Sequence, residues 1–259
     1  LQAYAANISK FGFTGVFIIY PSKQNPLSAE IINVLNIALS NIQSQLVMFK
    51  QNEHLVHISS TDPLSMLKNR HALQEFISLE NERLRRYKTK RKFVVQETVA
   101  FIDLDNFKYY NDNFGHEAGD LFIGKFGQLL KSVYRRVDFI ARFGGDEFVV
   151  ILSDATCEEA KRVGERLFES LRDAKHFVPE LEDFLGHKVS IPKRKLMNFS
   201  MGLCSNYDLK ETSDLEQVLT NADHALYYSK KHGKGSITIW NEIKHSISLG
   251  KSRHKKTEF

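Results

Sequence analysis

Cysteine is scarce in this sequence, and so are long apolar runs. The two cysteines, Cys157 and Cys204, are too few for a disulfide framework and lack the spacing of a zinc site. The longest apolar stretches, such as Val16–Tyr20 and Phe148–Leu152, have the length of strands and not of a membrane span. The amino terminus also lacks the charged-then-apolar pattern of a secretory signal. We therefore expect a cytoplasmic protein with no membrane partner within this chain.

The small excess of basic residues does not predict a nucleic-acid partner. The formal net charge is +5, and four of the cations lie in the last few residues, at Lys251, Arg253, Lys255 and Lys256. Such an end is typical of a frayed tail. We find no nucleic-acid recognition module in the sequence. With 259 residues, 42% of them hydrophobic, the chain has enough apolar material for a sizeable core.

The first 60 residues contain too few elements for a domain of their own. Phe13–Tyr20 predicts a strand, and Ser28 is a plausible N-cap for a long amphipathic helix. The apolar positions of that helix recur every three or four residues, at Ile31, Leu35, Ala38, Ile42, Leu46 and Phe49. A strand, a turn and a long helix resemble the end of a GAF-type sensor domain running into a signalling helix. The alternative is a generic coiled-coil linker, and both interpretations predict a homodimer through parallel helices.

The sequence pattern of residues 61–242 predicts one α+β domain. Thr61-Asp62-Pro63 is a helix start signal, and Asn69 looks like the cap of the next helix. The expected elements are strand 98–104, helix 121–133, hairpin 139–143 and 148–152, helix 157–171, a loop-rich stretch 176–196, strand 198–204, helix 215–230 and strand 237–240. This order predicts an antiparallel sheet with helices on one face. We expect residues 243–259 to form a basic, flexible tail.

Two groups of acids are candidates for chemistry. Asp103 ends a predicted strand and is followed by Asp105, a pattern that is typical of a cation site but equally of a helix-capping Asp. Asp146 and Glu147 directly follow a Gly144-Gly145 turn at the head of an apolar strand. Adjacent carboxylates repel one another unless a cation offsets their charge. Glycine lets a ligand approach the backbone closely.

The string Arg-Phe-Gly-Gly-Asp-Glu-Phe at 142–148 is the signature of the GGDEF family of diguanylate cyclases, which this chain resembles. Four further blocks match the family in order, at 62–70, 103–120, 198–202 and 222–234. The resemblance implies a ferredoxin-like palm fold, a βαββαβ variant. It also implies an enzyme that condenses two GTP into cyclic di-GMP and two pyrophosphates across a dimer. Two Mg²⁺ ions per site would assist, with Mn²⁺ as an alternative.

The same resemblance implies roles for individual residues. Asp103 and Asp146 are metal ligands, with the Leu104 carbonyl assisting, and Glu147 is either a further ligand or the group that helps deprotonate the 3′-hydroxyl. The resemblance assigns guanine recognition to Asn111 and Asp120, phosphate binding to Lys108, Lys230 and Lys234, and the turn beneath the nucleotide to Gly144 and Gly145.

Arg135 and Asp138 match the family's inhibitory product site, and Arg166 matches an arginine that completes it. The sequence departs from the family at Lys234, where Arg is usual, at Gly235, where Asn is usual, and at Met66, where Gly is common. We expect weaker phosphate binding from the first of these departures. The alternative function is a catalytically silent receptor that binds GTP or cyclic di-GMP and signals through protein contacts. Retention of Asp103, Asp146 and Glu147 favours the enzyme.

Overall fold

The computed structural model describes residues 4–10, 13–19, 28–58, 60–89, 96–208 and 214–247. The chain divides into two compact units, Leu1–Ser59 and Ser60–Phe259. Within the described ranges, no helix has both the length and the apolar character needed to cross a membrane.

The first unit contains a β-hairpin followed by one helix. β1 (Tyr4–Lys10) and β2 (Phe13–Ile19) pair antiparallel along their whole length. The prediction of a strand at 13–20 is confirmed. β1 was not expected, because Ile8 is its single β-branched residue and no clear alternation marks it.

The helix α1 (Ala29–Ile58) has 30 residues. The Ile31 amide donates to the Ser28 hydroxyl oxygen at 3.3 Å, so the predicted N-cap is confirmed. Several apolar side chains of α1 are exposed, including Ile31 at 47%, Val34 at 65% and Ile37 at 63%. The side chains of Leu46 and Phe49, which the predicted apolar seam includes, lie outside the described part of the chain.

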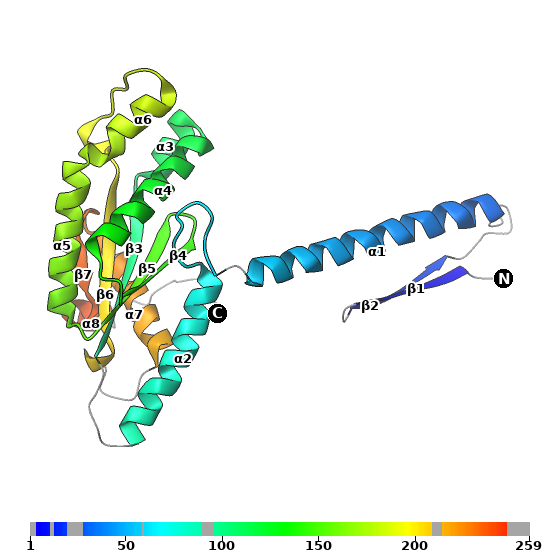
Figure 1. The fold of residues 1–259 in the computed structure, drawn as a ribbon, viewed down its shortest axis with the longest axis horizontal. Coiled ribbons are helices and arrows are strands. Elements are labelled where there is room, and N and C mark those ends of the chain that lie inside the picture. The colour runs from blue at the N-terminus through cyan, green and yellow to red at the C-terminus, as the bar shows by residue number, and fades with distance from the viewer. Residues whose placement is uncertain are drawn as a thin grey trace. The chain divides into compact units, whose positions relative to one another are not determined.

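The second unit is built on a five-stranded sheet of order β4-β5-β3-β6-β7 (Figure 1). The strands are β3 (Glu97–Asp105), β4 (Phe139–Gly144), β5 (Glu147–Ser153), β6 (Asn198–Ser205) and β7 (Ile237–Ile239). All neighbours pair antiparallel except β6 and β7, which are parallel. The predicted βαββαβ order from β3 to β6 is confirmed, with one parallel pair added at the edge.

Helices cover both faces of this sheet, so the prediction of helices on one face is wrong. Ala100, Ile102 and Leu104 of β3 face one core, and Val99 and Phe101 face a second. The first core is covered by α3 (Phe107–Phe114), α4 (His116–Val133), α5 (Cys157–Asp173) and α6 (Val178–Leu185), and the second by α2 (Arg70–Thr89) and α7 (Leu215–Lys231). A central strand that is buried on both faces needs apolar residues without alternation, as β3 has.

Three further local predictions need correction. Asp62 caps a turn and not a helix: its carboxylate accepts hydrogen bonds from the Ser65 amide at 2.8 Å and hydroxyl at 2.7 Å. The prediction that Asn69 caps the next helix is confirmed, because α2 begins after it and its side chain accepts from the Ala72 amide at 2.9 Å. The stretch 176–196 contains α6, and residues 240–247 form α8 (Trp240–Ile247), which extends into the predicted tail.

Candidate active site

The three predicted catalytic acids lie at one end of the sheet. Asp103 is opposite Glu147 in the β3–β5 register. The Leu104 amide donates to the Asp146 carbonyl at 3.1 Å, which holds the hairpin turn against the end of β3. Asp103 is 5% exposed. A strand end and a neighbouring hairpin therefore bring these carboxylates together, as the sequence predicted.

The negative charge of Asp103 is only partly compensated by its neighbours. One of its carboxylate oxygens pairs with the Lys230 ammonium, and the other is buried and has no hydrogen-bond partner among the described residues. Burial, and then the Asp146 charge, raise the pKa of Asp103 to about 7 although Lys230 opposes the change. Burial, followed by Asp223 and Asp146, also raises the pKa of Glu147. Such a site favours any added positive charge.

The residues fit a hard divalent cation by their chemistry. Asp103 has an unsatisfied buried oxygen, and Asp146 and Glu147 add carboxylate oxygens, which are the ligands that Mg²⁺ prefers. The described residues do not, however, include a preformed group of three metal-binding side chains. Lys230 pairs with one Asp103 oxygen, and the other oxygen is available to a cation.

The signature hairpin turns on Gly145 and Asp146, one residue later than predicted. Gly144 is paired with Glu147, and the β4 register shifts between Arg142 and Gly144. Gly145 has a φ of +51°, a conformation that glycine adopts without strain. A Cβ atom added at Gly144 or Gly145 would meet nothing within 4 Å. The space above this turn is therefore open to a ligand.

Arg142 fixes the turn and was not predicted as a site residue. Its guanidinium donates to the Gly145 carbonyl at 2.8 and 3.0 Å and to both Asp62 carboxylate oxygens at 3.1 and 3.2 Å. Burial alone would raise the pKa of Asp62, but hydrogen bonds from Ser65 and the Arg142 charge outweigh it, so the pKa lies below its usual value. The position of Arg142 just before the Gly-Gly pair was the signal that could have identified it.

A second fixed turn follows α7 and carries Lys234. The buried Asp105 carboxylate accepts from the Ser200 hydroxyl at 2.9 Å and from the Gly235 amide at 2.8 Å. Gly235 has a φ of +56°, and a Cβ atom there would lie 2.7 Å from the Asn198 side-chain nitrogen, which explains glycine at this position. Asp105 thus positions the Lys230–Lys234 segment and is not a helix cap.

The predicted guanine-reading residues come from adjacent helices. Asn111 of α3 lies against Gly119 of α4, because a Cβ atom at Gly119 would fall 1.9 Å from the Asn111 Oδ1 atom. That oxygen is buried and has no hydrogen-bond partner in the described structure. Asp120, the next residue, is exposed, and Lys108 is exposed at the start of α3. α3 begins two residues after Asp105, so this group follows directly from the carboxylate end of β3.

The predicted product site lies at the other end of β4. Arg135 and Asp138 form a turn in which the Arg135 amide donates to the Asp138 carboxylate at 2.8 Å. Both residues line a small cavity of about 30 Å³ together with Arg166 of α5 and Tyr134. The Tyr134 hydroxyl is buried without a hydrogen-bond partner in the described structure. Burial and then the Asp138 charge raise the pKa of Tyr134, while the Arg166 charge lowers it. The structure therefore brings Arg135, Asp138 and Arg166 together around Tyr134.

The sequence model of the family described as "Diguanylate cyclase, GGDEF domain" matches residues 59–236. Diguanylate cyclase A of Treponema denticola is 30% identical over 202 residues, which are 78% of this chain and 50% of that protein. Diguanylate cyclase DgcP of Pseudomonas aeruginosa is 39% identical over 179 residues, which are 69% of this chain and 24% of that protein. The chain therefore spans half or less of the length of these relatives.

Solved structures of GGDEF domains have the same fold. The GGDEF domain of TpbB (YfiN) from Pseudomonas aeruginosa is 27% identical with a TM-score of 0.55, over 73% of this chain and 99% of that one. The GGDEF domain of DgcB from Caulobacter crescentus, solved in complex with cyclic di-GMP, is 22% identical with a TM-score of 0.54, over 70% and 96% of the two chains.

Proposed function

Since this chain belongs to the GGDEF family of diguanylate cyclase domains, we propose that it condenses two GTP molecules into cyclic di-GMP with release of two pyrophosphates. The observation that carries the proposal is the meeting of Asp103, Asp146 and Glu147 at one sheet end, with Asp103 buried and electrostatically unsatisfied. Carboxylates in this arrangement suit the binding of a cation that assists phosphoryl transfer.

The reaction consists of two equivalent steps, and each forms a bond between the 3′-oxygen of one nucleotide and the α-phosphorus of the other. The bond from that phosphorus to the β-phosphate bridging oxygen breaks, pyrophosphate leaves, and the 3′-hydroxyl gives up its proton. Mg²⁺, or Mn²⁺ in its place, neutralises the phosphates and activates the nucleophile when it is bound. Asp103, Asp146 and the Leu104 carbonyl would hold the two ions of the site, and Glu147 would be a further ligand or the group that accepts the proton.

The remaining residues of the site hold and orient the nucleotide. Asn111 and Asp120 read guanine, because a carboxylate accepts from the guanine N1–H and amino group whereas adenine offers the opposite pattern. Lys108, Lys230 and Lys234 hold the phosphates, and Lys230 exchanges Asp103 for a phosphate oxygen when GTP binds. The open space above Gly144 and Gly145 receives the nucleotide.

Each active site acts on one half of the product, so two chains must meet. We assign this pairing to α1, whose apolar side chains are exposed. The interpretation of residues 1–60 as the end of a GAF-type sensor, and of the cytoplasm as the working compartment, belongs to the same proposal. Arg135, Asp138 and Arg166 form the site at which product slows synthesis.

The test is a direct assay of synthesis. The purified chain is incubated with GTP and Mg²⁺, and cyclic di-GMP and pyrophosphate are measured by chromatography. We expect both products from the native chain and neither from Asp146→Ala. A folded, dimeric native chain that binds GTP and forms no product would instead establish the silent receptor.

Arg135→Ala tests the regulatory part of the proposal. We expect this variant to continue synthesis at product concentrations that stop the native chain. Equal inhibition of both proteins by added cyclic di-GMP would show that the product site is misassigned.

A further inference from the structure

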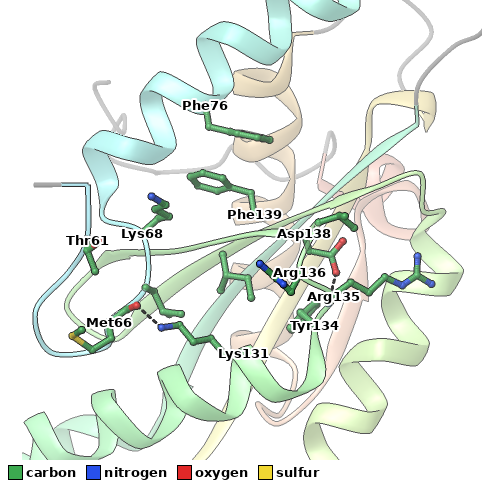
Figure 2. A pocket seen from close by; sticks show the side chains of 13 residues that line it. Thr61, Met66, Lys68, Phe76, Lys131, Tyr134, Arg135, Arg136, Asp138 and Phe139 are labelled. Atoms are coloured by element: carbon green, nitrogen blue, oxygen red, sulfur yellow. Dashed lines mark hydrogen bonds between the residues drawn. The ribbon is translucent and has the colours of Figure 1, made fainter.

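A second and larger cavity lies on the side of β4 that faces α2. Its volume is about 550 Å³, which is within the range of small-molecule binding sites. The segment Thr61–Lys68, Phe76 of α2, the end of α4 and the start of β4 enclose it (Figure 2). None of the predicted metal, guanine or phosphate residues lines it.

The cavity has an excess of positive charge. Lys68, Lys131 and Arg136 line it, and its one acidic lining residue, Asp138, already accepts from the Arg135 amide. Lys131 donates to the Met66 carbonyl at 2.5 Å and Lys68 to the Ser60 hydroxyl at 3.1 Å, and both of these partners are neutral. Arg135 and Asp138 of the predicted product site also line the cavity, and Figure 2 shows the Arg135 guanidinium directed away from Lys68, Lys131 and Arg136.

The opposite wall of the cavity is aromatic and apolar. Phe76 and Phe139 stack with ring centroids 4.2 Å apart and an interplanar angle of 23°. Leu67, which is buried, and Ile140, which is half-buried, continue this wall. A ligand that matches both walls has an anionic group at one end and a flat apolar body at the other.

Met66 on the rim supports a specific use of the cavity. It is 61% exposed and has a φ of +57°, a conformation that costs energy for any residue except glycine. This chain therefore has a strained backbone at a residue whose exposed apolar side chain lines the cavity.

We propose that this cavity is a binding site for a phosphate-bearing molecule of mononucleotide size. The phosphate lies among Lys68, Lys131 and Arg136, which suit it through charge-assisted hydrogen bonds. The flat body lies against Phe139, and Met66 lies on the rim beside Lys131.

Backbone hydrogen bonds connect this site to the catalytic turn. The Lys68 amide donates to the Ile140 carbonyl at 3.1 Å, and the Arg142 amide donates to the Lys68 carbonyl at 2.8 Å. Arg142 in turn holds the Gly145 carbonyl and Asp62. A ligand that fixes the Thr61–Lys68 segment therefore acts on the turn that carries Asp146. This link rests on the proposed function, whereas the binding site does not.

Binding is tested by calorimetry with AMP, and with pyrophosphate as the anion alone. AMP is chosen because the guanine-reading pair disfavours adenine in the GTP site. We expect AMP to bind the native chain, and Arg136→Ala to weaken its binding about tenfold or more through the loss of one charge-assisted contact. The matched control is Arg172→Ala on α5, an exposed arginine outside the cavity, which should bind AMP as the native chain does.

Met66→Gly separates binding from folding. This variant should unfold at a higher temperature, because the backbone strain is relieved, and yet bind AMP several-fold more weakly. Absence of AMP binding at millimolar concentration, or equal weakening by Arg136→Ala and Arg172→Ala, would overturn the site.

The link to catalysis has its own readout. AMP should change the initial rate of cyclic di-GMP formation by the native chain and leave Arg136→Ala unaffected; an unchanged native rate at saturating AMP overturns the link. Asp146→Ala, which makes no product under the proposed function, should still bind AMP. Failure of the synthase proposal is therefore distinguishable from failure of this one.

Discussion

At the scale of single residues, buried acids set the electrostatic character of the domain. Asp103 and Glu97 lie on the same strand and both have a pKa raised to about 7. For Glu97 burial is the largest cause and the Glu80 charge the second. Arg83 is 2.9 Å from Glu80 and 3.7 Å from Glu97, so one guanidinium serves two carboxylates. Asp103 is near the end of β3 where we propose that catalysis occurs, whereas Glu97 is the first residue of the strand. A substitution at Glu97 therefore tests how burial and a neighbouring carboxylate raise a pKa without changing the proposed active site.

Glu97→Gln should therefore make the domain less sensitive to pH. Because folding raises this pKa from 4.5 to about 7, the unfolded chain holds fewer protons than the folded chain in that window, and the free energy of unfolding falls as pH rises through it. The amide cannot ionise, so the variant should be more stable than the native chain at pH 8 by about 1–3 kcal/mol. Denaturant unfolding between pH 4.5 and 8 measures this effect.

The control for Glu97→Gln is Glu158→Gln, an exposed position on α5. Asp103 still titrates in the variant, so the pH dependence should be reduced and not abolished. A native-like slope in Glu97→Gln would show that Glu97 is ionised at neutral pH in the folded chain.

Arg142 shows how one side chain couples two motifs of the sequence. Arg142→Lys keeps the charge but cannot hold the Gly145 carbonyl and both Asp62 oxygens with one ammonium. We expect the rate of cyclic di-GMP synthesis to fall about 10- to 100-fold because the turn that carries Asp146 is less well positioned. Steady-state kinetics measures the change.

A double-mutant cycle between Arg142→Ala and Asp62→Ala completes this test. The two residues are in direct contact, so a coupling energy of about 1–3 kcal/mol in unfolding is expected. If the changes in the free energy of unfolding of the two single variants simply add, and Arg142→Lys has native kinetics, then Arg142 does not position the turn that carries Asp146.

At the scale of elements, local sequence signals predicted most of the domain correctly. The apolar strands β3, β5 and β6, the helices α5 and α7 and the Asn69 cap follow from periodicity and capping chemistry. The signals failed where tertiary contacts decide. Asp62 resembles a helix cap, but its carboxylate is held by Ser65 and Arg142 in a turn. No local pattern could show that partner, which lies 80 residues away.

The site was predictable to the same extent. The meeting of Asp103 with Asp146 and Glu147 follows from a strand end and a Gly-Gly hairpin. The role of Asp105 does not, because its partners Ser200 and Gly235 lie on other elements and two of the three groups are buried. The stretch 176–196 looked like a loop, yet Leu181 of α6 is fully buried in the first core, so packing and not local propensity makes it a helix.

Helix α4 offers a test of how an element positions a substrate group. Gly119→Ala should push the Asn111 carboxamide from its place, because the new Cβ would lie 1.9 Å from its oxygen. We expect KM for GTP to rise about tenfold or more, with the fold retained, through the loss of guanine hydrogen bonds. Kinetics with GTP and the thermal unfolding midpoint measure the two effects.

Gly124→Ala is the matched control in the same helix. Its Cβ would lie 3.4 Å from the Leu64 carbonyl, an ordinary contact, and alanine favours the helix. This variant should keep the native KM. If Gly119→Ala also keeps the native KM, Asn111 does not read the base from this position.

At the scale of the whole molecule, the proposed synthesis brings two chains together, and α1 is the element that we expect to join them. Val34 and Ile37 are 65% and 63% exposed and lie three residues apart, on one face of the helix. Pairing with a second copy would bury this face. Val34→Glu with Ile37→Glu should lower the dimer fraction and, at nanomolar protein, the specific activity. Raising the protein concentration should restore the rate per dimer, because neither residue belongs to the active site.

Asn36→Glu adds one charge at an exposed position of the same helix. It should leave association unchanged, because residues one or two apart in a helix do not face each other, and Asn36 is two residues from Val34 and one from Ile37. Sedimentation equilibrium measures the dimer fraction, and initial rates over a range of protein concentrations measure the activity. Below the dissociation constant the rate should rise with the square of the protein concentration, and the double variant should shift this range upward. A double variant that dimerises and synthesises like the native chain at every concentration would show that the two active sites meet without this face of α1.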